Sequence, residues 1–386
     1  MSSNNFDVII IGAGSVGLPT AHFLSKEKFS VLVIDEKPSA GQGQNKTVIG
    51  GVRATHSDPA KIQTCLLSLK VFSSWKEETG DDIHFQKGGY SFPVYDEKDE
   101  KTLKDLLKIQ KEYGLVIDWL DKKDIQQILP GINHDNLRGG TYSPDDANVS
   151  PLLTCVSFYN QSKKKGAKFK FNEKVIDILE ENERVVGVKT SKDIYFAPIV
   201  INCAGAYARQ IGEMVELNIP VYPDSHEAGI TEPVKKFFEP LVVDVRGDEH
   251  SKNFYFYQNH HGQVVFCLTP HPLVPGYDNN ATSSFLPIAA RRMINLFPKL
   301  QNIKVRRTWR GLYPMTPDGV PIVDEVKELK GFYLAVGLCG QGFMLGPGIA
   351  LNLVNIILKG TPILPLQVFK GFSFYRDFGG AQEILR

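Results

Sequence analysis

The sequence has few cysteines, and no two of them lie close enough together to suggest a shared site. Only 5 cysteines occur in 386 residues, and none forms a Cys-x-x-Cys pair. This spacing argues against a disulfide framework and a structural zinc site, and it favours a reducing compartment. No carboxylate–histidine spacing resembles a known metal site. We therefore expect a cytoplasmic protein without a bound metal.

An excess of charge of one sign is also lacking. The 44 basic and 43 acidic side chains leave a net charge of +1, which gives no electrostatic reason to expect nucleic acid as a partner. No basic region precedes the short apolar run at 8–11, so no signal peptide is expected. Residues 333–358 carry no charge, but several glycines and Pro347 interrupt them. They predict a strand, a glycine-rich loop and a helix rather than a membrane span.

The length and the order of apolar segments predict two domains. A chain of 386 residues exceeds one typical domain, and 42% hydrophobic residues suffice for a large core. The pattern begins as strand, glycine turn, helix and strand over residues 6–34, which indicates a parallel βαβ unit. Further helices are expected at 58–76, 98–114, 152–165, 287–297 and 347–358. Further strands are expected at 169–175, 185–190, 199–202 and 332–336, with a hairpin over 253–257 and 263–268.

This order is typical of a nucleotide-binding domain that a second, antiparallel domain interrupts. We expect an α/β protein with a discontinuous Rossmann-like domain for the cofactor at 1–88, 142–218 and 320–386. An antiparallel-sheet substrate domain is expected at 89–141 and 219–319.

The strongest local signal is the glycine motif at residues 11–17, Ile-Gly-Ala-Gly-Ser-Val-Gly. It follows a predicted strand and opens a predicted helix, which is the context that a dinucleotide-binding turn requires. Gly12 permits the tight turn, Gly14 lets the backbone approach a pyrophosphate, and Gly17 lets helix and strand pack closely. The N-terminus of the helix then offers N–H groups to the phosphates.

A carboxylate follows at the end of the second predicted strand. Asp35 lies eighteen residues after Gly17 and is placed to accept hydrogen bonds from an adenosine ribose, with the adjacent Glu36 as the alternative. No second glycine motif of this kind occurs, so one dinucleotide is expected. The motif alone does not distinguish NAD from FAD.

Five separated motifs carry a resemblance to a known family. Besides residues 11–17, they are Gly50–Arg53, Val200–Ala208, Thr231–Val234 together with Trp309–Ile322, and Gly337–Gly348. In this order they resemble the FAD-dependent amine and amino-acid oxidoreductases of the D-amino-acid oxidase superfamily. Within that superfamily the sequence looks similar to the β-subunits of sarcosine oxidase and of dye-linked proline dehydrogenase.

The resemblance implies a glutathione-reductase-type FAD fold with bound FAD. Because the cysteine that binds FAD covalently in monomeric sarcosine oxidases has no clear counterpart at 310–318, the FAD is expected to be noncovalent. It places the loop at Gln44 and Asn45 around the pyrophosphate, Val175 at the adenine, and the run at 340–344 against the flavin ring. The residues expected to bind the cofactor are Gly12, Ala13, Gly14, Ser15, Val16, Asp35, Glu36, Gln44, Asn45, Gly51, Val52, Val175, Cys203, Ala204, Gly205, Arg310, Gly340, Gln341, Gly342, Phe343 and Met344.

The reaction implied is hydride transfer from an amine C–H bond to flavin N5, which gives an imine that water hydrolyses. The substrate expected is a small secondary amine or amino acid, similar to sarcosine, proline or glycine. A substrate carboxylate needs a cation or several hydroxyls as an anchor. The candidate catalytic residues are Arg53, Tyr255, Tyr257, Tyr313 and Met344. Arg310 is a further candidate anchor, and His56 and His226 are candidates to shape the pocket.

Some departures from the family leave other functions open. Residues 263–269 lack the lysine that monomeric sarcosine oxidases carry near the flavin, and Met344 stands where they have a second lysine. Gly139-Gly140-Thr141 is not followed by the histidine that binds FMN covalently in heterotetrameric sarcosine oxidases. The alternatives are an electron-transferring subunit of a hetero-oligomeric amino-acid dehydrogenase, a flavin-dependent 2-hydroxy-acid oxidoreductase, and an FAD-binding subunit without turnover.

Overall fold

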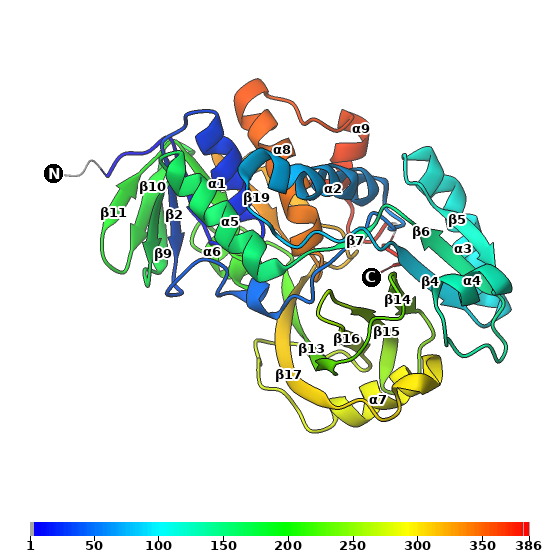
Figure 1. The fold of residues 1–386 in the computed structure, drawn as a ribbon. Helices are drawn as coiled ribbons and strands as arrows, with labels where there is room; N and C mark the ends of the chain where they lie inside the picture. Colours follow the sequence, from blue (N-terminus) through cyan, green and yellow to red (C-terminus); the bar gives the residue numbers. More distant parts are fainter. Residues whose placement is uncertain (1–3, 381, 386) are drawn as a thin grey trace.

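A six-stranded sheet forms the centre of the first lobe in the computed structural model, which describes residues 4–380 and 382–385 (Figure 1). Its strand order is β18-β19-β12-β1-β2-β8, and all neighbours are parallel except the antiparallel pair β18–β19. The strands are β1 (Val8–Ile11), β2 (Val31–Asp35), β8 (Lys168–Phe171), β12 (Ile199–Asn202), β18 (Ile322–Glu325) and β19 (Phe332–Val336). Every residue of β1 is buried, as expected for a strand that is covered on both faces.

Helices cover one face of this sheet and a small sheet covers the other. Helix α1 (Gly17–Lys26) packs against α5 (Pro151–Lys164) and α8 (Gly342–Lys359), and α8 packs against α2 (Pro59–Thr79). On the opposite face lie the antiparallel strands β9 (Val175–Glu181), β10 (Arg184–Thr190) and β11 (Ile194–Phe196), which share a core with β1 and β12. Shorter elements here are η1 (Gln44–Thr47), β3 (Gly51–Val52), β7 (Ala147–Asn148), η2 (Gly205–Tyr207), α6 (Ala208–Glu213), α9 (Leu366–Phe369) and η4 (Lys370–Phe372).

The second lobe is built on an eight-stranded sheet with the order β17-β13-β16-β15-β14-β4-β6-β5. Its neighbours are antiparallel except β14 and β4, which run parallel. The strands are β4 (Tyr90–Val94), β5 (Asp118–Asp121), β6 (Gly139–Ser143), β13 (Tyr222–Pro233), β14 (Leu241–Asp244), β15 (Ser251–Gln258), β16 (Gln263–Pro270) and β17 (Val305–Met315). The helices are α3 (Glu97–Glu112), α4 (Lys122–Ile128), α7 (Phe285–Leu296) and η3 (Pro298–Leu300).

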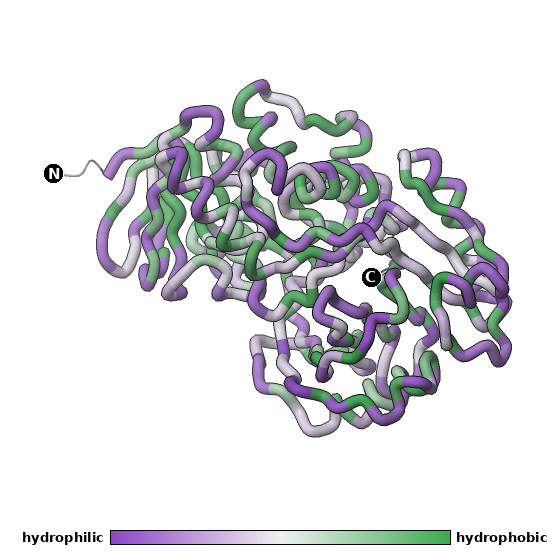
Figure 2. Tube along the Cα trace, in the orientation of Figure 1, coloured by the Kyte–Doolittle hydropathy of each residue, from purple (hydrophilic) through white to green (hydrophobic). Residues whose placement is uncertain are grey.

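The fold class expected from the sequence is confirmed, and the structure differs from the expected elements at several places. The single strand expected at 169–175 is two strands, because Asn172 adopts a left-handed conformation with φ of 53° and turns the chain from β8 into β9. Strand β6 extends to Ser143, two residues beyond the expected boundary after residue 141. Figure 2 shows that the hydrophobic segments lie largely inside both lobes.

Helix α8 begins five residues before the expected Pro347, which lies inside it. Since proline has no N–H, it removes one hydrogen bond of the helix without ending it here. The helix is long and apolar enough to cross a membrane by length and composition alone, but it packs between α1 and α2. A Cβ on Gly346 would lie 2.1 Å from the backbone oxygen of Ser15. The close packing of α8 on the glycine turn therefore depends on this glycine.

Candidate active site

One cavity of about 360 Å³ runs from the glycine turn after β1 to the sheet of the second lobe. Its wall combines the carboxyl ends of β1 and β2, the loop before β3, the N-terminus of α8, and one face of β13, β15, β16 and β17. Crevices at the carboxyl ends of parallel strands are the usual ligand sites of open α/β sheets. The cavity thus connects the predicted nucleotide site with the predicted substrate site.

The glycine turn at one end of the cavity is closed on one side and open on the other. A Cβ on Gly12 would lie 2.5 Å from the Cys203 backbone oxygen, and a Cβ on Gly17 would lie 2.0 Å from the Gly12 oxygen. A Cβ on Gly14 would have no atom within 4 Å, although Gly14 lines the cavity. This open space beside a helix N-terminus fits the pyrophosphate of a dinucleotide.

Asp35 organises the turn as well as facing the cavity. Its Oδ2 accepts a hydrogen bond from the Ala13 N–H at 2.7 Å, and its Oδ1 accepts from the Lys37 N–H at 2.8 Å. Each carboxylate oxygen retains a lone pair for a ribose hydroxyl. Burial raises the pKa of Asp35 above its ordinary value despite these two hydrogen bonds. Glu36, which also lines the cavity, forms an ion pair with Lys37 at 2.7 Å.

The loop at η1 is fixed between three parts of the structure. The Ser15 hydroxyl donates to Asn45 Oδ1 at 2.5 Å, and Asn45 Nδ2 donates to the Pro151 oxygen at 3.1 Å. The Leu312 N–H of β17 donates to Gln44 Oε1 at 2.6 Å. The loop therefore connects the glycine turn, the start of α5 and the second lobe, and both Gln44 and Asn45 line the cavity.

The start of α8 closes the far end of the nucleotide half. Gly340 has φ of 78°, and a Cβ there would lie 2.1 Å from Cε2 of Tyr313. Gln341 precedes the helix, and its buried Oε1 has no hydrogen-bond partner among the described residues. The N–H groups at this helix N-terminus suit the part of a flavin where negative charge develops on reduction.

Two tyrosine hydroxyls meet in the wall of the substrate half. Tyr255 Oη and Tyr313 Oη lie 2.7 Å apart, and both residues line the cavity. Burial raises the pKa of both hydroxyls well above the ordinary value, so they remain protonated donors. Cys267 of β16 lines the same wall, and burial raises the pKa of its thiol to about 11. These groups offer hydrogen bonds but no nucleophile at neutral pH.

A histidine beside this pair has one nitrogen without a partner. The His226 ring stacks on Tyr313 with centroids 3.7 Å apart, and its Nε2 lies 3.0 Å from Asp224 Oδ2. Its Nδ1 is buried without a hydrogen-bond partner among the described residues. Burial lowers the pKa of His226 below its ordinary value although Asp224 opposes this. A neutral His226 that donates from Nε2 to Asp224 presents Nδ1 as an acceptor.

Arg53 lines the cavity, but the protein already binds much of its guanidinium. Nη1 donates to the Thr55 backbone oxygen and lies 3.3 Å from His56 Nδ1. Nη2 donates to the Leu385 backbone oxygen at 2.6 Å. Burial, and then the charge of Arg53, lowers the pKa of His56 well below its ordinary value. Arg53 is thus the fixed cation of the substrate half.

Most of the residues predicted from the sequence lie in the cavity wall, but Ala13, Val52, Tyr257, Arg310 and the fully buried His56 do not. The Ala13 N–H donates to Asp35, and the side chain of Val52 in β3 is buried in the core of the first lobe. Tyr257 donates its hydroxyl to the Ile49 oxygen, so it supports the loop before β3 instead of facing the cavity. Arg310 donates to Asp278 Oδ2 at 2.8 Å.

The cavity wall also contains residues that the sequence did not single out as site residues. The cavity-lining residues of this kind in the substrate half are Tyr90, Val243, Asn253, Cys267 and Thr269. They come from four different strands of one sheet. Strand alternation could have indicated Cys267 and Thr269 once the facing side of β16 was known. No local pattern marks Tyr90. The described residues contain no group of His, Cys, Asp and Glu able to hold a metal ion.

Comparison with known proteins identifies the family of this chain. Residues 7–356 match the family model described as FAD dependent oxidoreductase. The sarcosine oxidase subunit beta of Rhizobium meliloti is 26% identical, over 97% of this chain and 89% of that protein. The mitochondrial sarcosine dehydrogenase of Homo sapiens is 27% identical over 92% of this chain, which spans only 40% of that protein. The crystal structure of L-proline dehydrogenase from P. horikoshii is 29% identical, with a TM-score of 0.91 over 98% of this chain and 100% of that one.

Proposed function

Because this chain belongs to the family of FAD dependent oxidoreductases, we propose that it dehydrogenates a small secondary amine or amino acid to an imine. The observation that carries the proposal is a cavity that joins a dinucleotide cradle to a pocket lined by the fixed guanidinium of Arg53. The names of the sarcosine- and proline-oxidising relatives support a substrate of this class.

The residues of the nucleotide half fit FAD. The open space at Gly14 takes the pyrophosphate, Asp35 the ribose, and the N-terminus of α8 the pyrimidine side of the ring. Bound FAD supplies a two-electron acceptor for the hydride of the substrate. The protein contributes the orientation of the substrate toward the cofactor.

In the substrate half, each group has a role that follows from its chemistry. Arg53 offers N–H donors to a carboxylate, and the hydrogen-bonded pair of Tyr255 and Tyr313 adds one neutral O–H donor, since one hydroxyl donates to the other. We assign to the neutral Nδ1 of His226, which has no protein partner among the described residues, a hydrogen bond from a substrate N–H that orients the amine. Met344 contributes an apolar surface at the start of α8.

Anaerobic spectroscopy tests this function. We expect the FAD absorbance of the purified protein to bleach with at least one of sarcosine, L-proline, glycine and D-amino acids. We expect Tyr313→Phe to slow the bleaching, whereas Tyr257→Phe, outside the cavity, serves as the matched control. If the flavin stays oxidised with every amine in the panel and is reduced by a 2-hydroxy acid instead, the amine proposal is excluded.

A second proposal concerns the electron acceptor. The cavity-lining residues of β16 include Cys267 and Thr269, and the strand contains no lysine. This composition supports transfer of electrons to a carrier or a partner subunit rather than to oxygen. We expect an artificial dye to be reduced much faster than hydrogen peroxide forms, and rapid stoichiometric peroxide production would contradict it.

A further inference from the structure

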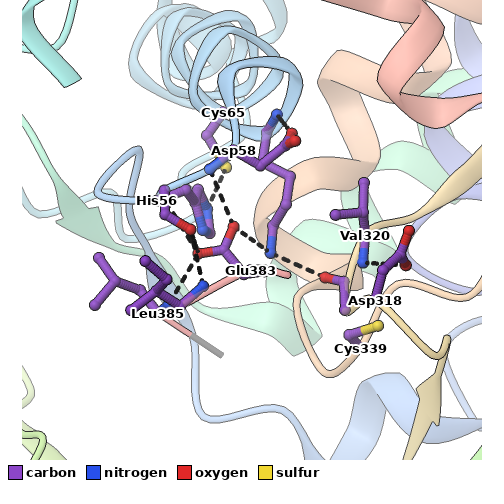
Figure 3. Close-up of polar contacts among 12 residues, drawn as sticks. His56, Asp58, Cys65, Asp318, Val320, Cys339, Glu383 and Leu385 are labelled. Atoms are coloured by element: carbon purple, nitrogen blue, oxygen red, sulfur yellow. Dashed lines mark hydrogen bonds and ion pairs between the residues drawn. The ribbon is translucent and has the colours of Figure 1, made fainter. Parts of the chain in front are cut away.

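A buried carboxylate joins the segment 382–385 to the start of α2 (Figure 3). Glu383 Oε2 lies 3.0 Å from Lys61 Nζ, and both side chains are fully buried. Glu383 Oε1 accepts hydrogen bonds from the Ser57 N–H at 3.0 Å and from the Ser57 hydroxyl at 2.8 Å. Although burial favours the neutral acid, Lys61 and these donors hold the pKa of Glu383 well below its ordinary value.

Packing alone does not account for an ion pair in this place. Moving two charges out of water costs several kcal/mol per ion, and apolar side chains of the same volume commonly stabilise a fold equally well. A buried ion pair holds the groups it connects in one defined position, because separating the two charges would leave each of them buried without a partner. The pair therefore fixes where the segment 382–385 lies relative to α2.

The backbone of the segment 382–385 connects Glu383 to Arg53. The Leu385 N–H donates to Glu383 Oε1 at 2.9 Å, and the Ile384 N–H donates to the Ser57 hydroxyl at 2.8 Å. The Leu385 carbonyl is thereby held where it accepts from Arg53 Nη2 at 2.6 Å. The Leu385 side chain is buried with Tyr90 in the core of the second lobe. The segment thus connects α2, the second lobe and the cation of the substrate half.

The guanidinium of Arg53 has five N–H donors. Its contacts with Thr55, His56 and Leu385 use both N–H groups of Nη1 and one N–H group of Nη2. Among the described residues, the remaining donors at Nε and Nη2 have no hydrogen-bond partner in the protein. A planar fork binds a carboxylate well only when its plane is fixed. The Leu385 carbonyl supplies one of the contacts that fix this plane.

We propose that Glu383 is a positioning residue for carboxylate binding: through the Leu385 carbonyl it fixes the Arg53 guanidinium and so sets the affinity for the acid group of the substrate. Glu383 itself does not line the cavity. This inference rests on the proposed function, because it assumes that Arg53 binds a substrate carboxylate. It assigns no chemical step to Glu383.

Acetate is the probe, because it carries the carboxylate and no oxidisable amine. Its dissociation constant is measured from the change in flavin absorbance of the oxidised FAD protein. We expect Glu383→Gln to weaken acetate binding by about tenfold, which corresponds to roughly 1.4 kcal/mol, with little change in the FAD spectrum without acetate. With an amine substrate, the same variant raises KM while kcat changes by less than about twofold.

The variants separate positioning from folding. Because Glu383→Gln leaves a buried ammonium without its partner, the double variant Lys61→Met, Glu383→Met removes both charges and is expected to fold and show the same loss of acetate affinity. Arg53→Lys weakens acetate binding, and adding Glu383→Gln to it has no further effect if Glu383 acts through Arg53. Asp244→Asn disrupts another buried ion pair, with Arg292 in the second lobe, and leaves acetate affinity unchanged.

The outcomes are distinguishable. Wild-type acetate affinity in Glu383→Gln, or additive losses with Arg53→Lys, overturns the inference. If the wild type oxidises an amino acid but does not bind acetate, the inference fails while the proposed function stands. If acetate binds in a Glu383-dependent manner and no amine reduces the flavin, the inference stands and the proposed function fails.

Discussion

Two glycines of one motif are glycines for different physical reasons. At Gly17 a side chain would collide with the backbone of Gly12, so this residue is required by the fold itself. At Gly14 a side chain would meet no protein atom within 4 Å, so the requirement comes from the ligand. The sequence motif marks both positions equally, and only the three-dimensional surroundings separate them.

This difference predicts opposite effects of the same substitution. Gly14→Ala should leave the melting temperature of the FAD-free protein unchanged and weaken FAD by at least about tenfold, because its methyl group occupies the space of the pyrophosphate. Gly17→Ala should lower that melting temperature, because its Cβ would lie 2.0 Å from a carbonyl oxygen. Thermal unfolding and FAD titration of both variants check this. Equal destabilisation of the FAD-free forms would show that Gly14 is also a packing residue.

At the scale of elements, the sequence predicts the bounds of a helix or strand best where a single local pattern of residues is sufficient to determine it. The strand at 332–336 is found where it was expected, because five consecutive apolar residues leave no choice of face. The start of α8 was misplaced, because glycines and Pro347 favour a loop locally, and only packing on the turn at Ser15 makes residues 342–346 helical. Tyr257 was expected in the cavity wall for a related reason. The alternation of residues along a strand predicts which face of the sheet a side chain lies on, but not which segment packs on that face, and here the loop at Ile49 packs on it.

One element whose role no sequence pattern indicated is the segment 271–284 between β16 and α7. The Tyr277 ring stacks on Tyr207 with centroids 5.2 Å apart, and the Gln210 amide donates to its hydroxyl at 3.4 Å. Tyr207 and Gln210 line the cavity near its adenosine end. Asp278 of this segment is held by Arg310. The segment therefore supports the part of the cavity wall that Tyr207 and Gln210 form.

We expect Tyr277→Ala to raise the FAD dissociation rate by about two- to tenfold, since an aromatic pair contributes roughly 0.5–1.5 kcal/mol. Stopped-flow fluorescence of released FAD measures this rate. Leu273→Ala, in the same segment and at a residue that is 45% exposed, is the control and should leave the rate unchanged. If both variants release FAD at the wild-type rate, the segment does not support the adenosine site.

At the scale of the whole molecule, the site exists only where the two lobes meet. The sequence predicted the nucleotide half well, because a short continuous motif encodes its turn. The substrate half could be predicted only in part, because it is assembled from six strands of the second sheet and from Arg53, whose contacts include Leu385, more than 300 residues away. Pairings at that separation follow from the fold and not from local sequence.

Since both lobes line the cavity, the bound cofactor should couple their stabilities. FAD at 100 times its dissociation constant stabilises the native state by about 2.7 kcal/mol, and we expect it to protect the chain between the lobes against proteolysis. ADP, which has only the adenosine half, should raise the melting temperature without this protection, because it does not reach Tyr313 and the start of α8. Differential scanning fluorimetry and limited proteolysis with each ligand measure the two effects, and riboflavin is the control that lacks the adenosine half. Full protection by ADP would mean that the lobes are coupled without the flavin, through contacts such as the Leu312 N–H to Gln44 and the segment 382–385.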